Sequence, residues 1–271
     1  MKLVKLGAAA ALSTALLASG VAGFSAQATS GAIEGEDGKY GTTGDVEFKA
    51  SEDIEKPVHP TDPDPEKPVT PVDPTDPEKP VGPGTAGPLS IDYVSSFNFG
   101  EQEIATTDKT YYSAPQTYLT ADGEIDEERT SANYMQVTDK RGSSAGWALK
   151  VEQVKPFTAE DATTANPTLD GVTMKLNAGE TNSTSDSAAP TAKTIEIDSV
   201  GSPQTILNAN EKQGTGTWTS TFGEYVAGEE YQGVELTIPG KTQTDAVKYQ
   251  TELKWALEST PDNDFAPDEE I

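Results

Sequence analysis

The chain has no cysteine, a single histidine, and only 19 lysines and arginines against 45 aspartates and glutamates. The missing cysteines exclude disulfide bonds, thiolate metal sites, a cysteine nucleophile and a lipidated N-terminal cysteine. The one histidine, His59, lies among prolines, so histidine triads and histidine-rich zinc sites are not expected in a folded domain. The net charge of −26 disfavours binding to nucleic acid or to an anionic membrane and favours solubility outside the cell.

Long hydrophobic runs are also scarce, and the one clear run lies at the N-terminus. Two lysines precede the uncharged run Leu6–Phe24, and Ala26-Gln27-Ala28 follows it, which predicts a signal peptide over residues 1–28. The alternative is a membrane anchor, but the most apolar part, Leu6–Ala18, is too short to span a bilayer. We find neither another apolar span nor a sortase signal, so we expect a secreted protein held at the cell surface without a covalent or membrane anchor.

Proline is concentrated in residues 55–88, which hold eleven of the nineteen prolines. The sequence Asp64–Val69 returns there as Asp76–Val81. Such a density of proline favours polyproline II and predicts a stiff spacer. Recognition of this segment by an aromatic groove is a less favoured alternative.

Residues 29–54 form an N-terminal segment ahead of the spacer. Within it, residues 44–49 alternate polar and apolar side chains, as a β-strand does. Two alternatives stay open: a strand that returns to the main domain, or an unstructured tail.

The remaining residues, 89–271, alternate in short segments separated by turn-forming residues, which predicts an all-β domain built as an antiparallel β-sandwich. We find no helical pattern. The predicted strands are Ser90–Val94, Asn133–Thr138, Gly146–Val154, Gly171–Leu176, Thr194–Val200, Thr215–Phe222, Gly233–Ile238 and Ala246–Glu258.

Few patterns in this domain are typical of a catalytic or metal site. Paired carboxylates are the remaining catalytic option, but with 45 acidic residues such pairs occur by chance. The acidic run Asp122–Glu128 lacks the spacing of a calcium-binding EF-hand loop, so a solvated loop is favoured over a calcium site. We therefore expect no enzymatic activity, catalytic residue, metal or cofactor.

The most informative residues are two tryptophans, each followed by Ala-Leu. Trp147 and Leu149 fall on one face of their predicted strand, and Trp255 and Leu257 do so near the C-terminus. Packing in a sandwich core explains this arrangement, and we favour it for both leucines. For Trp147 and Trp255, core packing and ligand contact stay equally open, and Trp218 is a further candidate for contact.

These motifs resemble those of WxL-domain surface proteins of low-GC Gram-positive bacteria. The proximal motif matches within Gly146–Val151 and the distal motif within Trp255–Leu257. The stretches Leu89–Gly100 and Gly216–Thr219 are also similar to the family, as is the order of signal peptide, spacer and domain. The resemblance covers nearly all of the mature chain.

The resemblance implies non-covalent attachment to the cell wall, with peptidoglycan as ligand and Trp147, Leu149, Trp255 and Leu257 as signature residues. It also implies the alternative function of an assembly subunit. In that case the partners are a membrane-anchored WxL-interacting protein and sortase-anchored surface proteins.

Overall fold

A computed structural model describes residues 42–77, 81–161 and 163–268. The predicted signal peptide lies outside these residues. The chain divides into two compact units, residues 1–47 and 48–271. The described part of the first unit has no regular structure, and every strand lies in the second unit.

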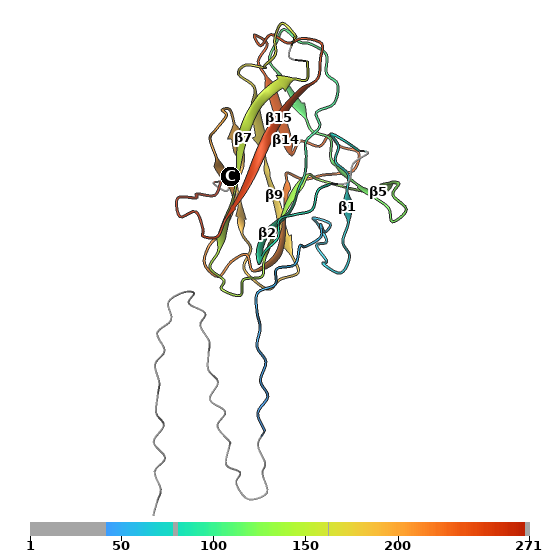
Figure 1. Cartoon of the computed structure of the whole chain (residues 1–271). Helices are drawn as coiled ribbons and strands as arrows, with labels where there is room; N and C mark the ends of the chain where they lie inside the picture. The colour runs from blue at the N-terminus through green and yellow to red at the C-terminus, as the bar shows by residue number, and fades with distance from the viewer. Residues whose placement is uncertain (1–41, 78–80, 162, 269–271) are drawn as a thin grey trace, which may run out of the picture. The chain divides into compact units, whose positions relative to one another are not determined.

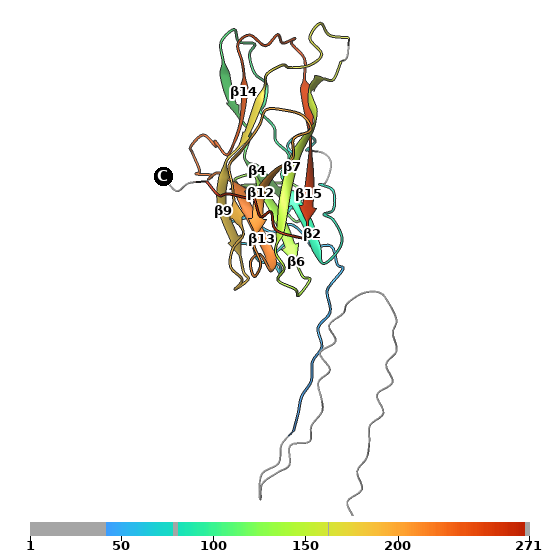
Figure 2. The ribbon, with the colours of Figure 1, turned by 90° about the vertical axis from the view of Figure 1, so that its left-hand side faces the viewer.

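The strands of the second unit are short except for two that run side by side in Figures 1 and 2, β7 and β15. Their bounds are β1 (Thr70–Pro71), β2 (Leu89–Val94), β3 (Lys109–Tyr112), β4 (Gln116–Leu119), β5 (Ile125–Ser131), β6 (Tyr134–Asp139), β7 (Trp147–Ala159), β8 (Thr173–Leu176), β9 (Ala178–Ser183), β10 (Thr191–Ala192), β11 (Ile195–Ile197), β12 (Gln204–Ala209), β13 (Gly216–Phe222), β14 (Val234–Ile238) and β15 (Tyr249–Glu258). The described residues contain no helix, and therefore no helix that would cross a membrane.

The strands form four sheets in which all pairs are antiparallel. We name each sheet by a central strand: the β7 sheet (β10-β12-β7-β15), the β6 sheet (β2-β6-β13-β9), the β14 sheet (β11-β8-β14-β3) and the β4 sheet (β1-β4-β5). The all-β, antiparallel prediction is confirmed, and each predicted strand overlaps one in the structure. The division into four sheets is, however, not clearly a two-sheet sandwich.

One apolar core joins three of these sheets. Val137 of β6, Leu149 of β7, Leu176 of β8, Leu207 of β12 and Val234 of β14 are completely buried within it. Burying a side chain of this size contributes roughly 1.5–3 kcal/mol. Because these residues come from segments far apart in the sequence, the core fixes how the sheets face one another.

The proline-rich segment does not stand apart from this unit. Residues 51–72, which we call the strap, pack on the outer face of the β6 sheet, and residues 70–71 pair with β4. Val58 of the strap is 1% exposed, and the carbonyl of Pro60 accepts hydrogen bonds from Thr219 (2.8 Å) and Asn182 (3.2 Å). The expectation of an extended spacer does not hold for these residues, because proline removes backbone donors but leaves every carbonyl free to accept.

Gln136 of β6 holds the strap in place. Its amide nitrogen donates to the Lys56 carbonyl (3.0 Å) and to the buried carboxylate of Asp92 (2.9 Å), and its amide oxygen accepts the Val58 N–H (2.8 Å). One fully buried side chain therefore satisfies groups on the strap and on the sheet.

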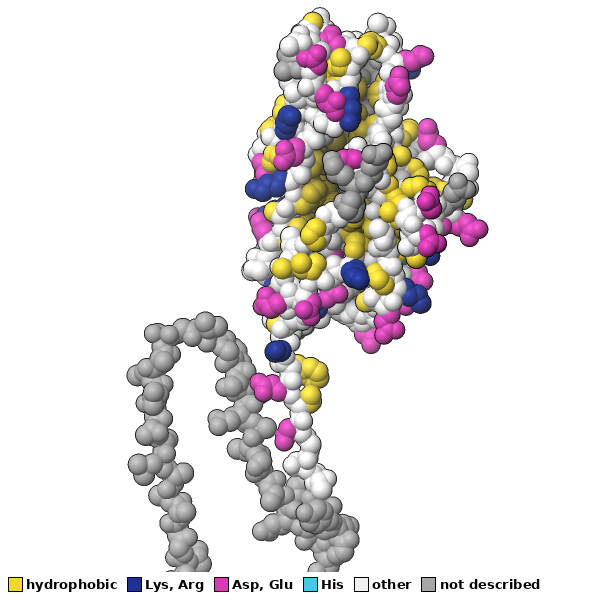
Figure 3. All heavy atoms as spheres, turned by 45° about the vertical axis from the view of Figure 1, so that its right-hand side comes forward, with side chains coloured by type: hydrophobic (Ala, Val, Ile, Leu, Met, Phe, Trp, Pro, Cys, Tyr) yellow, Lys and Arg dark blue, Asp and Glu magenta, His cyan; other side chains and the backbone are white. Residues whose placement is uncertain are grey.

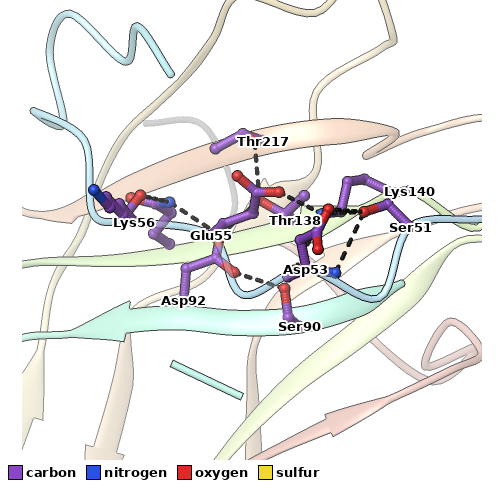
Figure 4. A network of polar contacts seen from close by, with 10 residues as sticks. Ser51, Asp53, Glu55, Lys56, Ser90, Asp92, Thr138, Lys140 and Thr217 are labelled. Carbon is purple, nitrogen blue, oxygen red and sulfur yellow. Dashed lines mark hydrogen bonds and ion pairs between the residues drawn. The ribbon is translucent and has the colours of Figure 1, made fainter. Parts of the chain in front are cut away.

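Asp92 contributes a buried carboxyl to the network in Figure 4. Burial raises the pKa of its carboxyl, while hydrogen bonds from Ser90 (2.6 Å), Thr138 (2.6 Å) and Gln136 act in the opposite direction. The carboxyl is thus fully hydrogen-bonded, as a buried acid must be to avoid a large desolvation cost.

Lys140, just after β6, fastens the beginning of the strap. Its ammonium group donates to the Ser51 hydroxyl (3.3 Å), to the Asp53 carbonyl (3.2 Å) and to the Glu55 carboxylate. The strap is therefore tied down from residue 51 onward.

Residues 44–49 form no strand in the part of the chain that the structure describes. Val46 and Phe48 are 78% and 88% exposed.

We predict that Gln136→Ala lowers the free energy of unfolding by about 2 kcal/mol, because it leaves buried polar groups of the strap without partners and removes one hydrogen bond from Asp92. Urea denaturation measures this change, and hydrogen exchange at the Val58 amide should accelerate. Gln250→Ala, at an exposed position of β15, serves as the control and should change stability by less than about 0.5 kcal/mol. Equal effects of the two substitutions would contradict this role of Gln136.

His59 is the group from which we expect a pH dependence of stability. Its ring lies 5.3 Å from that of Tyr118, and its pKa is lowered, first by burial and then by Arg129, whereas Asp62 raises it. The unfolded chain therefore takes up the proton more readily than the folded one, so stability falls as pH drops below about 6.5. The raised pKa of Asp92 acts with the opposite sign, because ionisation of that buried carboxyl with rising pH disfavours the fold.

We expect His59→Gln to flatten the pH dependence of the unfolding free energy between about pH 7.5 and 5. Chemical denaturation of both proteins across this range isolates the histidine, since Asp92 is common to both. Parallel curves for the two proteins would show that His59 is not the responsible group.

Candidate functional site

The two Trp-x-Leu motifs lie on neighbouring, paired strands. In the β7–β15 ladder Leu149 stands opposite Leu257, and Val151 stands opposite Trp255. Two segments far apart in the sequence therefore form one structural feature at the side of the β7 sheet.

The proximal motif is part of the core. Trp147 and Leu149 are completely buried among the residues of the apolar core. The indole N–H of Trp147 donates to the carbonyl of Gly214 (3.0 Å). The core packing expected for Leu149 is confirmed, and neither residue offers a surface to a ligand.

Gly214 is required by this tryptophan. Its φ is +70°, and a Cβ at this position would lie 2.6 Å from the indole nitrogen of Trp147. Both the backbone conformation and the close approach of the ring thus call for glycine.

The distal motif is only half-buried. Trp255 and Leu257 pack against the core from β15, which is the edge strand of its sheet. The Trp255 ring lies 6.3 Å from the buried ring of Phe222, at 49° to it. Within the described residues no acceptor is bound to its N–H. Trp255 thus has an apolar surface and a donor available to a ligand.

A hollow of about 320 Å³ opens beside Trp255. It lies between residues 81–85 and strand β2, where it is lined by Ile91, Tyr93 and Val94, and Asp73 adds a carboxylate. Figure 3 shows hydrophobic side chains along a hollowed part of the surface of this unit. The hollow therefore offers both apolar walls and polar groups.

Residues 81–85 approach β2 closely to form one wall of this hollow. The Thr85 N–H donates to the Ile91 carbonyl (2.8 Å), and a Cβ on Gly84 would lie 2.6 Å from the Cα of Asp92. This wall was not predicted from the sequence, although the pattern Gly-Pro-Gly at 82–84 is a signal for close backbone contact.

Trp218, the further candidate, is also interior. It is 4% exposed on β13, and its N–H donates to the Thr215 carbonyl (3.1 Å). Of the tryptophans singled out by the sequence, Trp255 alone therefore presents part of its ring to the surface.

In the acidic run Asp122–Glu128, residues 122–124 form a turn and residues 125–128 begin β5. The carboxylate of Asp126 lies 3.6 Å from the guanidinium of Arg129. Among the residues that the structure describes, no three histidine, cysteine or acidic side chains converge as metal ligands.

We predict that Gly214→Ala destabilises the protein far more than Gly142→Ala. Both glycines have φ of +70°, so both substitutions incur the same backbone strain of about 1–2 kcal/mol. A Cβ on Gly142 meets nothing within 4 Å, whereas one on Gly214 displaces Trp147 and should cost roughly 1–3 kcal/mol more. Thermal and urea unfolding of the two variants measure the difference. Equal losses would mean that the Trp147 site tolerates the added methyl group.

Comparison with known proteins gives one result. A family model described as "WxL domain surface cell wall-binding" matches residues 35–261. No curated protein and no solved structure matches the chain. The matched range includes the strap, the hollow and both Trp-x-Leu strands, and on this evidence the chain belongs to the WxL domain surface cell wall-binding family.

Proposed function

We propose that this protein is secreted after removal of residues 1–28 and attaches non-covalently to the peptidoglycan of the Gram-positive cell wall, without catalysis. The observation that carries the proposal is the match of residues 35–261 to a cell wall-binding family. The half-exposed distal motif supplies a surface for such a contact.

Trp255 is the residue we assign to ligand contact. An indole ring covers the apolar face of a sugar, and its N–H donates to a sugar oxygen, which together suit a glycan ligand. Leu257 supports the ring by packing on the core beside it. Trp147 and Leu149 contribute indirectly, since β7 holds β15 in place.

Electrostatic attraction is not the source of binding. The chain carries a net charge of −26, and the Gram-positive wall is itself rich in anionic polymer. Stacking and hydrogen bonding must therefore overcome a long-range repulsion, which salt screens. Wall binding should accordingly be unchanged or stronger in high salt.

A second candidate function is assembly with protein partners, as with a membrane-anchored WxL-interacting protein or sortase-anchored surface proteins. The observation that favours it is the position of β15 at the edge of its sheet, because an edge strand accepts a strand from another protein. Binding to walls stripped of all protein separates the two functions.

We predict that Trp255→Ala weakens binding to purified, protein-free walls about tenfold, which corresponds to the loss of roughly 1.4 kcal/mol. Leu253→Ala is the matched control, because Leu253 is a half-buried apolar residue on the same face of the same strand. Sedimentation of walls with labelled protein at low and high salt measures the binding.

Near-ultraviolet circular dichroism establishes that each variant is folded, and Trp255→Phe retains most of the packing if Trp255→Ala does not fold. Equal binding by the Trp255 and Leu253 variants would remove Trp255 from the site. Release of wall fragments by the protein, or loss of binding as salt rises, would contradict non-catalytic attachment of this kind.

A further inference from the structure

We propose that residues 44–49 of one copy add as a strand to the free edge of β15 in a second copy, so that the chain assembles with itself. The proposal goes beyond wall attachment, and it concerns a segment that wall attachment does not use.

Residues 44–49, which we call the arm, have the pattern of a strand but no partner strand. The arm alternates Val46 and Phe48 with Asp45, Glu47 and Lys49. Its two apolar side chains are the most exposed large hydrophobic residues in the part of the chain that the structure describes. Burial of such side chains between sheets would be favourable, and a six-residue strand is of ordinary length.

β15 offers the complementary edge. It is ten residues long and pairs with β7 alone within the described residues. Tyr249, Leu253, Trp255 and Leu257 are half-buried against the core on one face, and the residues of the other face are exposed, namely Gln250, Glu252, Lys254, Ala256 and Glu258. A strand added beside β15 with the same alternation would place its apolar side chains next to the half-buried residues of β15. Its charged side chains would then lie next to the exposed residues of β15.

Charge complementarity between the arm and β15 favours one register. In an antiparallel pairing with Glu47 opposite Lys254, Lys49 stands opposite Glu252, and both pairs have opposite charge. In the same register Phe48 stands opposite Leu253, and Val46 stands opposite Trp255.

Slipping by two residues destroys this match. One direction places Glu47 opposite Glu252, and the other places Lys49 opposite Lys254. A slip by one residue turns Val46 and Phe48 toward solvent.

The arm in this register must come from another copy. Ser51 is fastened to Lys140, and the neighbouring Arg141 donates to the carbonyl of Ser259, just beyond the end of β15 (2.8 Å). The register would place Ser51 opposite Gln250, nine residues or about 30 Å back along the strand. The strap therefore prevents a chain from pairing its own arm with its own β15 in this way.

The net charge of each copy opposes association at long range. Two strongly acidic chains repel each other, and salt reduces that repulsion more than it reduces the buried apolar contact. Assembly should therefore strengthen as salt is added. A sugar stacked on Trp255 and a strand paired along β15 would compete for the same strand.

Cross-linking tests the proposal, because the natural chain has no cysteine. Glu47→Cys in one copy and Lys254→Cys in another should form a disulfide-linked dimer when the exported proteins are mixed under mild oxidation. Directly opposite residues in antiparallel strands lie about 4.5–5.5 Å apart between Cα atoms, which suits a disulfide. Glu47→Cys mixed with Lys212→Cys is the control, since Lys212 is exposed and lies outside β15.

A cross-link to position 254 but not to position 212 supports the proposal. Equal cross-linking at both positions, or none at 254, would overturn it. An internal disulfide within a single chain that carries both Glu47→Cys and Lys254→Cys would also overturn it, because the arm would then reach its own β15.

Exchange of the two charges tests the register. Glu47→Lys or Lys254→Glu alone should weaken dimer formation about two- to fivefold in sedimentation velocity, and the double variant should restore it. Failure of the double variant to restore dimers would overturn the register. Glu47→Lys should bind walls normally, so loss of self-assembly and failure of wall binding are distinguishable.

Discussion

The antiparallel pairing of β7 with β15 is the contact on which the rest of the structure depends. It joins the middle of the chain to its C-terminal strand and places Leu149 opposite Leu257. β7 is a central strand and its tryptophan is enclosed in the core, whereas β15 pairs with β7 alone among the described residues and its tryptophan stays half-exposed. The same three residues, Trp-Ala-Leu, thus have different roles because their strands hold different positions in one sheet.

This difference marks the limit of what the sequence predicts. Alternation with a period of two assigns each side chain to a face, and it correctly located strands such as β2, β7 and β15. It does not say which strand pairs with which, because pairing depends on contacts between distant segments. The burial of Trp147 and the partial exposure of Trp255 could therefore not be predicted from the sequence. Strands such as β5 and β9 were missed because their sequences, IDEERTS and AGETNS, are polar and lack clear alternation.

The strap shows a second limit of composition. Its proline density correctly excludes helix, and backbone preference alone would leave it extended in solvent. The backbone preference of the strap sequence does not reveal that a sheet elsewhere in the chain offers hydrogen-bond donors to it. Gln136, Thr219 and Asn182 present such donors, and the strap supplies the carbonyls. These hydrogen bonds, together with apolar contacts such as Val69 against Tyr93 and Tyr134, hold the proline-rich segment on the sheet.

The charged residues on the exposed face of β15 limit unspecific pairing of this edge strand with other strands. Glu252, Lys254 and Glu258 alternate with the apolar side chains along the strand. An incoming strand with the wrong charges meets like charges, and one with the wrong alternation leaves apolar groups in water. Such an edge rejects most strands while accepting one that matches in both respects. Because the net negative charge of the chain adds a repulsion between copies, the proposed assembly requires a strand that buries apolar surface and pairs charges at the same time.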